Sequence, residues 1–261
     1  MNGIERIAAA FAGSGKRAAL MPYLMGGFPD LETSLRIGEA YAGGGADLVE
    51  LGIPFSDPLA DGPVIHAAGT KALAAGATVD GVLRLAERLA ERLPVVVMTY
   101  ANLVLARTPE GFADALAAAG VSGLIVPDLP LEEAPAILEA CDARGIALVP
   151  LVAPTTPDER LEAIGERARG FLYTVSVAGT TGERRSAEEA YAAVLRRARA
   201  HTGVPVALGF GIGTPAQASA AADAGADGVI VGSRLVREAG EAEDPPAAVR
   251  DVVRAMAAAL R

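Results

Sequence analysis

Hydrophobic residues fall into short runs that alternate with longer stretches in which apolar residues recur every three or four positions. The short runs are apolar at odd and even positions alike, which is typical of parallel strands buried on both faces. The longer stretches, rich in alanine and leucine, have the spacing of amphipathic helices. The predicted strands span residues 19–24, 47–51, 95–99, 123–126, 147–151, 171–175, 206–208 and 228–231, and the predicted helices span 31–41, 79–92, 109–119, 132–143, 157–167, 188–201 and 215–223.

This alternation predicts a single α/β domain that spans residues 1–261. Eight strands that alternate with helical stretches within 261 residues match a (β/α)8 or TIM barrel. A doubly wound parallel sheet is the alternative that the alternation leaves open. Ile4, Ile7 and Phe11 recur at helical spacing before the first strand and predict an additional N-terminal helix.

The same short pattern precedes three of the predicted strands. Gly45, Gly120 and Gly225 each follow a helical stretch, and each is followed by a short polar turn and an apolar strand. Glycine is common at helix ends because it adopts the left-handed conformation without strain. The intervals between the three are irregular, so the pattern indicates repeated strand–helix units and not a solenoid.

Composition and charge narrow the possible classes of function. Hydrophobic residues make up 51% of the chain, which is enough for a sizeable core. The chain has 32 acidic and 23 basic residues, and this excess of negative charge argues against nucleic-acid binding. One cysteine, Cys141, cannot form an internal disulfide. The longest apolar tract, 93–106, is too short and too interrupted to span a membrane, and the N-terminus lacks the apolar core of a signal peptide. We therefore expect a cytoplasmic protein that binds neither membranes nor nucleic acid.

Two acidic residues are candidates for catalysis. Glu50 ends the second predicted strand, on the side of a barrel where active sites form. Burial of an unpaired carboxyl group is costly and raises its pKa toward the range useful to a general acid or base. Asp61 closes the following loop, which is rich in proline and glycine, so both carboxyl groups could face one cavity and divide the roles. The alternative is a Glu50 carboxylate satisfied by backbone groups or an arginine, and Asp57 is expected to shape a turn.

Glycines follow the last two predicted strands, where barrels commonly bind phosphate. Gly209 and Gly211 follow the seventh strand, and Gly232 and Ser233 follow the eighth. Backbone N–H groups at such glycines can approach an anion, and a helix that starts after Gly232 would direct its N-terminus at a phosphate. The alternative is that these glycines only turn tight corners. The small and polar loop 177–186 suits a lid over a bound phosphoester, or is simply a solvated loop.

Counts of residue types exclude other chemistry. Neither lysine, Lys16 or Lys71, ends a predicted strand, so a Schiff-base aldolase is not expected. Two histidines, His66 and His201, are too few for a metal site with several histidine ligands, and we predict no metal. Cys141 lies in a helical pattern and is expected to be a core residue.

The run LVELGIPFSDPLADGP at residues 48–63 resembles the tryptophan synthase alpha chain family, and the resemblance covers nearly the whole chain. The resemblance implies cleavage of indole-3-glycerol phosphate to indole and glyceraldehyde 3-phosphate. This retro-aldol reaction uses the protonated indole ring as its electron acceptor, and it implies no cofactor in this chain. Supporting motifs are MTYAN at 98–102, PDLP at 127–130, TG at 181–182, GFGI at 209–212 and VGS at 231–233.

The resemblance also implies roles for individual residues. Glu50 would deliver a proton to C3 of the indole and take one from the glycerol hydroxyl, and Asp61 would accept the indole N–H and stabilise the positive ring. The chain departs from the family pattern at His66 and at residues 178–180. The implied substrate-binding residues are Tyr100, Tyr173, Thr181 and Phe210, and the implied phosphate-binding residues are Gly182, Gly211, Gly232 and Ser233.

The resemblance further implies a partner. A beta subunit that carries pyridoxal phosphate would consume the indole within an α2β2 complex, and the indole would pass through a tunnel. Two other functions stay open on the residues alone: another phosphosugar barrel enzyme, and a catalytically silent phosphate-binding regulator. A metal-dependent epimerase would need more histidines, and an indole-glycerol-phosphate synthase would need a lysine at a strand end.

Overall fold

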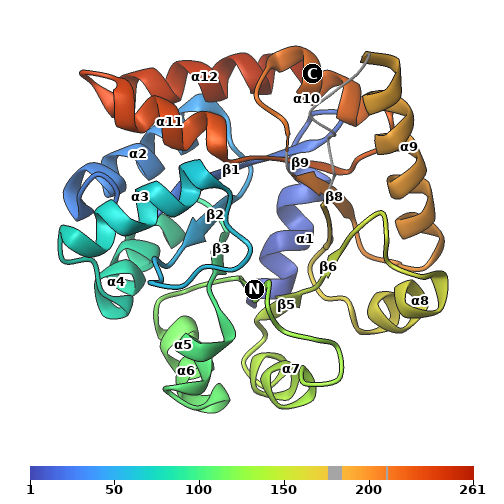
Figure 1. The fold of residues 1–261 in the computed structure, drawn as a ribbon, viewed down its shortest axis with the longest axis horizontal. Coiled ribbons are helices and arrows are strands. Elements are labelled where there is room, and N and C mark those ends of the chain that lie inside the picture. Colours follow the sequence, from blue (N-terminus) through green and yellow to red (C-terminus); the bar gives the residue numbers. More distant parts are fainter. Residues whose placement is uncertain (176–183, 210) are drawn as a thin grey trace.

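The computed structural model describes residues 1–175, 184–209 and 211–261, in which helices surround a parallel sheet (Figure 1). Hydrogen-bonded neighbours follow the order β5-β4-β3-β2-β1-β9-β8-β7-β6. The strands of the described residues are β1 (Ala19–Met25), β2 (Val49–Gly52), β3 (Val95–Met98), β4 (Gly123–Ile125), β5 (Ala147–Val149), β6 (Leu151–Val152), β7 (Leu172–Val175), β8 (Val206–Gly209) and β9 (Gly228–Val231).

Apart from the first helix, the helices follow strands in sequence and form the outer layer of the ring in Figure 1. Their bounds are α1 (Gly3–Gly13), α2 (Leu31–Gly44), α3 (Pro63–Ala74), α4 (Val79–Ala90), α5 (Ala101–Leu105), α6 (Pro109–Ala118), α7 (Pro135–Asp142), α8 (Asp158–Arg167), α9 (Arg184–Ala200), α10 (Pro215–Asp223), α11 (Ser233–Glu241) and α12 (Pro245–Ala259). The predicted TIM barrel with an additional N-terminal helix is confirmed.

The barrel closes at Pro150. β5 pairs with β4 and β6 pairs with β7, and this single residue joins the two ends of the sheet. Proline has no N–H to donate to a strand ladder, but the carbonyl of Pro150 still accepts a hydrogen bond from the backbone N of Tyr173 at 3.0 Å. The prediction of one continuous strand over 147–151 is therefore wrong at this residue, and the fifth strand is divided in two.

The ends of the helices follow local signals. The three glycines predicted to end helices have positive φ angles, +97° at Gly45, +66° at Gly120 and +97° at Gly225. α7 begins at Pro135 and not at residue 132, because proline is favoured in the first turn of a helix. The helices α3 and α12, which the hydrophobic pattern did not predict, also have proline in the first turn, so this signal could have found them.

The N-terminal helix α1 closes the end of the barrel at which the strands begin, and it crosses the middle of the ring in Figure 1. Asn2 and Glu5 form a capping box at its start. Ile7 is fully buried inside the barrel, where a Cβ on Gly123 would lie 3.1 Å from its Cδ1 atom. Arg6 donates hydrogen bonds to backbone carbonyls at the ends of α4 and α6. The closed end leaves the opposite end for a site.

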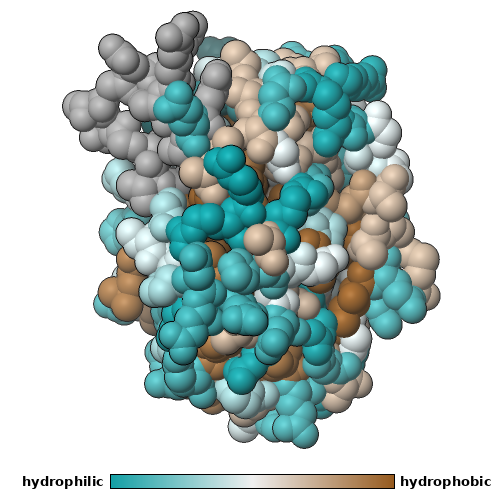
Figure 2. Space-filling view, turned by 90° about the vertical axis from the view of Figure 1, so that its right-hand side faces the viewer, coloured by the Kyte–Doolittle hydropathy of each residue, from teal (hydrophilic) through white to brown (hydrophobic). Residues whose placement is uncertain are grey.

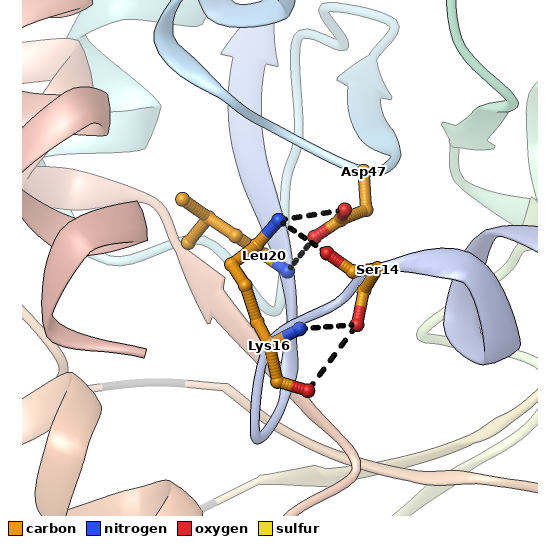
Figure 3. A network of polar contacts seen from close by, with 4 residues as sticks. All are labelled: Ser14, Lys16, Leu20 and Asp47. Carbon is orange, nitrogen blue, oxygen red and sulfur yellow. Dashed lines mark hydrogen bonds and ion pairs between the residues drawn. The ribbon is translucent and has the colours of Figure 1, made fainter. Parts of the chain in front are cut away.

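Asp47 links the first two strands at the closed end (Figure 3). Its carboxylate accepts hydrogen bonds from Nζ of Lys16 at 2.8 Å and from the backbone N of Leu20 at 2.7 Å. Ser14 completes the network by accepting from the backbone N of Lys16 at 3.2 Å. Both charged side chains are largely buried, at 9% and 11% exposure. Lys16 thus joins the segment after α1 to Asp47 through a largely buried ion pair.

The outer faces of the helices are polar. Figure 2 shows the face that carries α8 and α9, which hydrophilic side chains cover over most of its area. On this face Arg197 pairs with Asp158 at 2.7 Å, and Arg160 pairs with Glu132 at 2.8 Å. Of the helices in the described ranges, none combines the length and the apolar character needed to cross a bilayer.

Candidate active site

The predicted site residues that the structure describes lie at the end of the barrel opposite α1, where the parallel strands end. Glu50 lies in β2 and Tyr173 in β7, and Asp61 and Tyr100 follow β2 and β3. Gly211 follows β8, and Gly232 and Ser233 follow β9. Thr181, Gly182 and Phe210, together with most of the predicted lid loop 177–187, lie outside the described residues.

Glu50 is buried inside the barrel, with 1% of its surface exposed. The strand register places it between Tyr23 of β1 and Val96 of β3. No described group forms a hydrogen bond with its Oε2 atom, so the alternative of a carboxylate satisfied by backbone or arginine is not observed for this oxygen. Burial, with a smaller contribution from the negative charge of Asp61, raises the pKa of Glu50 to about 8. Glu50 therefore carries a proton at neutral pH.

Asp61 has a different environment. It is half-buried, and its Oδ1 atom accepts a hydrogen bond from the Tyr100 hydroxyl at 2.9 Å. Burial raises the pKa of Asp61, while the Tyr100 hydrogen bond and the charge of His66 act in the opposite direction. The two acidic residues thus lie in different environments, because the effect of burial is partly offset at Asp61 and reinforced at Glu50.

Contacts around Tyr100 hold the loop after β2 in place. The Tyr100 hydroxyl accepts a hydrogen bond from the backbone N of Ala60 at 3.1 Å, and its ring stacks on Phe55 with centroids 5.3 Å apart. Asp128, after β4, accepts a hydrogen bond from the backbone N of Ala101 at 2.9 Å and so fixes the start of α5. The sequence pattern does not reveal this positioning role of Phe55 and Asp128, because it depends on contacts between different strands.

Two tyrosines occupy the space beside glycines in the barrel. A Cβ on Gly52 would lie 2.1 Å from the hydroxyl oxygen of Tyr23, and a Cβ on Gly209 would lie 2.4 Å from that of Tyr173. Glycine is therefore required at both positions. Burial is the main reason that the pKa of each tyrosine is raised, and the charge of Glu50 contributes in both cases. Tyr173 is one of the substrate-binding residues that the family resemblance implies, and Tyr23 was not predicted.

The last two loops offer backbone N–H groups to an anion. Gly211 has a φ of +78° and is exposed, so it does turn a tight corner. Gly232 precedes α11, and no described side chain caps the N-terminus of this helix. Ser233 is exposed in the first turn. A Cβ on Gly232 would lie 3.7 Å from Cβ of Tyr23, so this glycine lies beside the residue that the strand register pairs with Glu50. An uncapped helix start of this kind favours phosphate binding.

The described residues contain no group of three His, Cys, Asp or Glu side chains placed to hold a metal ion. The chemistry available to them is the transfer of protons by Glu50 and Asp61 next to an uncapped helix start, a position that favours anions. Fold and site together define an acid–base enzyme of the α/β-barrel class that acts on a small anionic substrate.

Comparisons with known proteins identify the family. The model of the family described as "Tryptophan synthase alpha chain" matches residues 10–260. A tryptophan synthase alpha chain from Gloeobacter violaceus is 50% identical over 236 residues, which cover 89% of this chain and 86% of that protein. The chain therefore belongs to the tryptophan synthase alpha chain family. It is a lyase of tryptophan biosynthesis, and its reaction is the cleavage of indole-3-glycerol phosphate.

Solved structures agree with this assignment. A tryptophan synthase structure from Mycobacterium tuberculosis is similar with a TM-score of 0.89 and 38% identity over 98% of both chains. A structure of the a2b2 tryptophan synthase complex from Pyrococcus furiosus is similar with a TM-score of 0.87 and 36% identity, over 92% of this chain and 98% of that chain.

The burial of Glu50 predicts how stability depends on pH. Its pKa is about 8 in the folded chain and about 4.3 in an unfolded one, so the folded state holds the proton more tightly. Stability should therefore fall as the pH rises from about 4.3 to about 8. Glutamine stays neutral, so Glu50→Gln should not show this loss. The unfolding free energy of Glu50→Gln minus that of wild type should therefore be larger at pH 9 than at pH 4, by a few kcal/mol.

Urea unfolding at the two pH values measures this difference. Glu87→Gln, at an exposed position of α4, is the matched control and should follow wild type at both. An equal pH dependence of Glu50→Gln and wild type would contradict the buried, protonated state of Glu50.

Proposed function

We propose that Glu50 and Asp61 are the catalytic pair with which this chain cleaves indole-3-glycerol phosphate. The observation that carries this assignment is the buried Glu50 carboxyl group, which lacks a described hydrogen-bond partner at Oε2 and holds a proton at neutral pH. Cleavage needs such a group, because indole leaves with a hydrogen on C3 where the carbon–carbon bond had been. A general acid with a pKa near the working pH is well suited to supply that proton.

The proton of Glu50 goes to C3 of the indole ring, which becomes positively charged. The bond between C3 and the glycerol chain then breaks, and its electron pair restores the aromatic ring. The hydroxyl on the adjacent carbon becomes the aldehyde of glyceraldehyde 3-phosphate and gives its proton to the Glu50 carboxylate. Glu50 ends the reaction protonated, as it began, so one residue serves as acid and then as base.

Asp61 supports the positive ring. As a carboxylate, it accepts the hydrogen bond of the indole N–H and stabilises the positive charge that C3 protonation creates. The hydrogen bond from Tyr100 at 2.9 Å leaves Oδ2 of Asp61 available for this contact. Because the charge that Asp61 stabilises is present only after the proton transfer, the interaction favours the transition state over bound substrate.

The remaining predicted residues bind the substrate. We assign Tyr100, Tyr173, Thr181 and Phe210 to the indole and glycerol portion. We assign the phosphate to the loops after the sixth, seventh and eighth barrel strands, supported by the uncapped start of α11. The residues of this phosphate site are Gly182, Gly211, Gly232 and Ser233.

A beta subunit is the proposed partner, as in the Pyrococcus furiosus complex. Two large apolar side chains are exposed at the end of the barrel that carries the site: Leu59 at 86% in the loop after β2 and Leu105 at 58% at the end of α5. Exposed apolar side chains of this size are typical of interfaces. We propose that they contact the beta subunit in an α2β2 complex, that pyridoxal phosphate is bound there and not in this chain, and that the complex is cytoplasmic.

Glu50→Gln should abolish most of the activity. The variant keeps the shape of the side chain but cannot donate an acidic proton, so we expect kcat to fall by about 10²- to 10⁴-fold with little change in KM. The assay is indole release from indole-3-glycerol phosphate, with and without a beta subunit. Glu87→Gln serves again as the control. Activity of Glu50→Gln within tenfold of wild type would refute the assignment.

Leu105→Asp should weaken binding of the beta subunit. A carboxylate at an apolar contact would be desolvated without a partner, and we expect affinity to fall at least about tenfold, equivalent to about 1.4 kcal/mol. Titration calorimetry with the beta subunit measures the change. Arg88→Asp, in the last turn of α4 near the starts of the strands, should bind as wild type does. Equal affinity of Leu105→Asp and wild type would place the interface elsewhere.

A further inference from the structure

Tyr23 is a buried tyrosine beside Glu50 to which the proposed reaction assigns no role. The register of β1 and β2 pairs Tyr23 with Glu50 directly. Tyr23 alternates along β1 with the same parity as Ala19 and Met21, which face the barrel interior. Its exposure is 4%. A hydroxyl group brought this far into an apolar interior needs a polar partner.

The hydroxyl of Tyr23 lies over the strand that carries Glu50. It lies 2.1 Å from the position that a Cβ on Gly52 would take. Gly52 and Glu50 face the same side of β2, about 6.6 Å apart at 3.3 Å per residue. An extended glutamate side chain spans most of that distance, so the Glu50 carboxyl group can reach the hydroxyl. Burial raises the pKa of Tyr23, and the negative charges of Asp61 and Glu50 raise it further.

The hydrogen bonds of the two groups are incomplete. The Tyr23 hydroxyl donates to Sδ of Met25 at 3.9 Å, and a thioether sulfur is a weak acceptor. Among the described residues, Oε2 of Glu50 has no partner. A neutral carboxyl group is a weaker acceptor than a carboxylate, because the negative charge strengthens the hydrogen bonds that the oxygens accept. Ionisation of Glu50 therefore strengthens its attraction for the Tyr23 hydroxyl relative to that of the sulfur.

We propose that Tyr23 is a positioning residue whose hydroxyl turns from the Met25 sulfur to the Glu50 carboxylate when Glu50 gives its proton to the substrate. This inference rests on the proposed role of Glu50 as the acid. The hydrogen bond stabilises the carboxylate and makes Glu50 a stronger acid than burial alone would allow. The other titratable groups whose charges act on Glu50 or Tyr23 among the described residues are Asp61, Tyr100 and Tyr41, and Tyr173 faces Glu50 from β7.

Tyr23→Phe tests the proposal through the pH dependence of cleavage. Because the protonated form of Glu50 starts the reaction, kcat/KM of wild type should fall at high pH with a midpoint near 8. Without the hydroxyl, the carboxylate loses its donor and the pKa of Glu50 rises. We expect the midpoint to move up by about half a unit to one unit, kcat at pH 7 to fall about fivefold, and KM to stay within about twofold.

Tyr41→Phe is the matched control. Its hydroxyl donates to the backbone carbonyl of Tyr23 at 3.0 Å, so the variant removes a buried tyrosine hydroxyl next to the same strand without removing the proposed donor. It should lower the melting temperature and leave the midpoint of the pH profile unchanged. Met25→Leu removes the competing sulfur, and its midpoint should move slightly below that of wild type.

The results separate the possible failures. A fall in kcat of Tyr23→Phe with an unmoved midpoint would show a merely structural role and overturn the proposal. An unchanged kcat and midpoint would overturn it as well. If Tyr23→Phe does not fold, a Met25→Leu midpoint at or above that of wild type would still overturn it. Absence of cleavage by wild type would contradict the proposed function of the chain and not the role of Tyr23 alone.

Discussion

A single buried carboxyl group sets the conditions for the rest of the site. Glu50 lies in β2 inside a closed barrel, where burial penalises its charged form and raises its pKa to about 8. Two features of the fold maintain this environment. Ile7 of α1 fills the opposite end of the barrel, and β1 and β3 flank β2 on its two sides. The burial costs stability at high pH, and in the proposed reaction the same energy would drive proton transfer to the substrate.

The groups around Glu50 are arranged to use its proton. Asp61 lies on the loop that follows β2. Tyr100 holds this loop in place, because its hydroxyl forms hydrogen bonds with Ala60 and Asp61 and its ring stacks on Phe55. This loop keeps the carboxyl group of Asp61 near that of Glu50, at a position that is only half-buried. Gly52 and Gly209 leave room for two neutral tyrosines, which supply hydroxyl groups without adding charge. A phosphate at the uncapped start of α11 would bind the substrate at a point remote from the proton transfer.

The sequence contains the information for the fold and for the acidic pair in different ways. Runs of apolar residues and helical spacing predict the barrel, because burial on both faces of a parallel strand leaves a distinctive pattern. Glu50 is recognisable as a charge at the end of such a run, and Asp61 by its place in a proline- and glycine-rich loop. The break at Pro150 was missed because an apolar run does not show which neighbour each half of a strand pairs with.

The position of Tyr23 beside Glu50 is not predictable from the sequence pattern. A tyrosine within an apolar strand has the pattern of a core residue, and only the register between β1 and β2 places it beside Glu50. Register depends on how strands pair across the sheet, which one sequence does not specify. The same holds for Asp128 and Phe55, whose contacts join loops from different strands. The assignments to Thr181, Gly182 and Phe210 stay predictions from the resemblance to the family.

The most direct test of the account is the titration of the Glu50 carboxyl group itself. Carbon-13 NMR of the protein labelled at the glutamate side-chain carboxyl carbon follows the protonation of each glutamate, and the signal lost in Glu50→Gln identifies Glu50. We predict that Glu50 titrates with a midpoint near pH 8, well above the midpoints of the exposed glutamates. A midpoint near that of an ordinary glutamate, about 4.3, would mean that Glu50 is a carboxylate at neutral pH and would contradict its role as the acid.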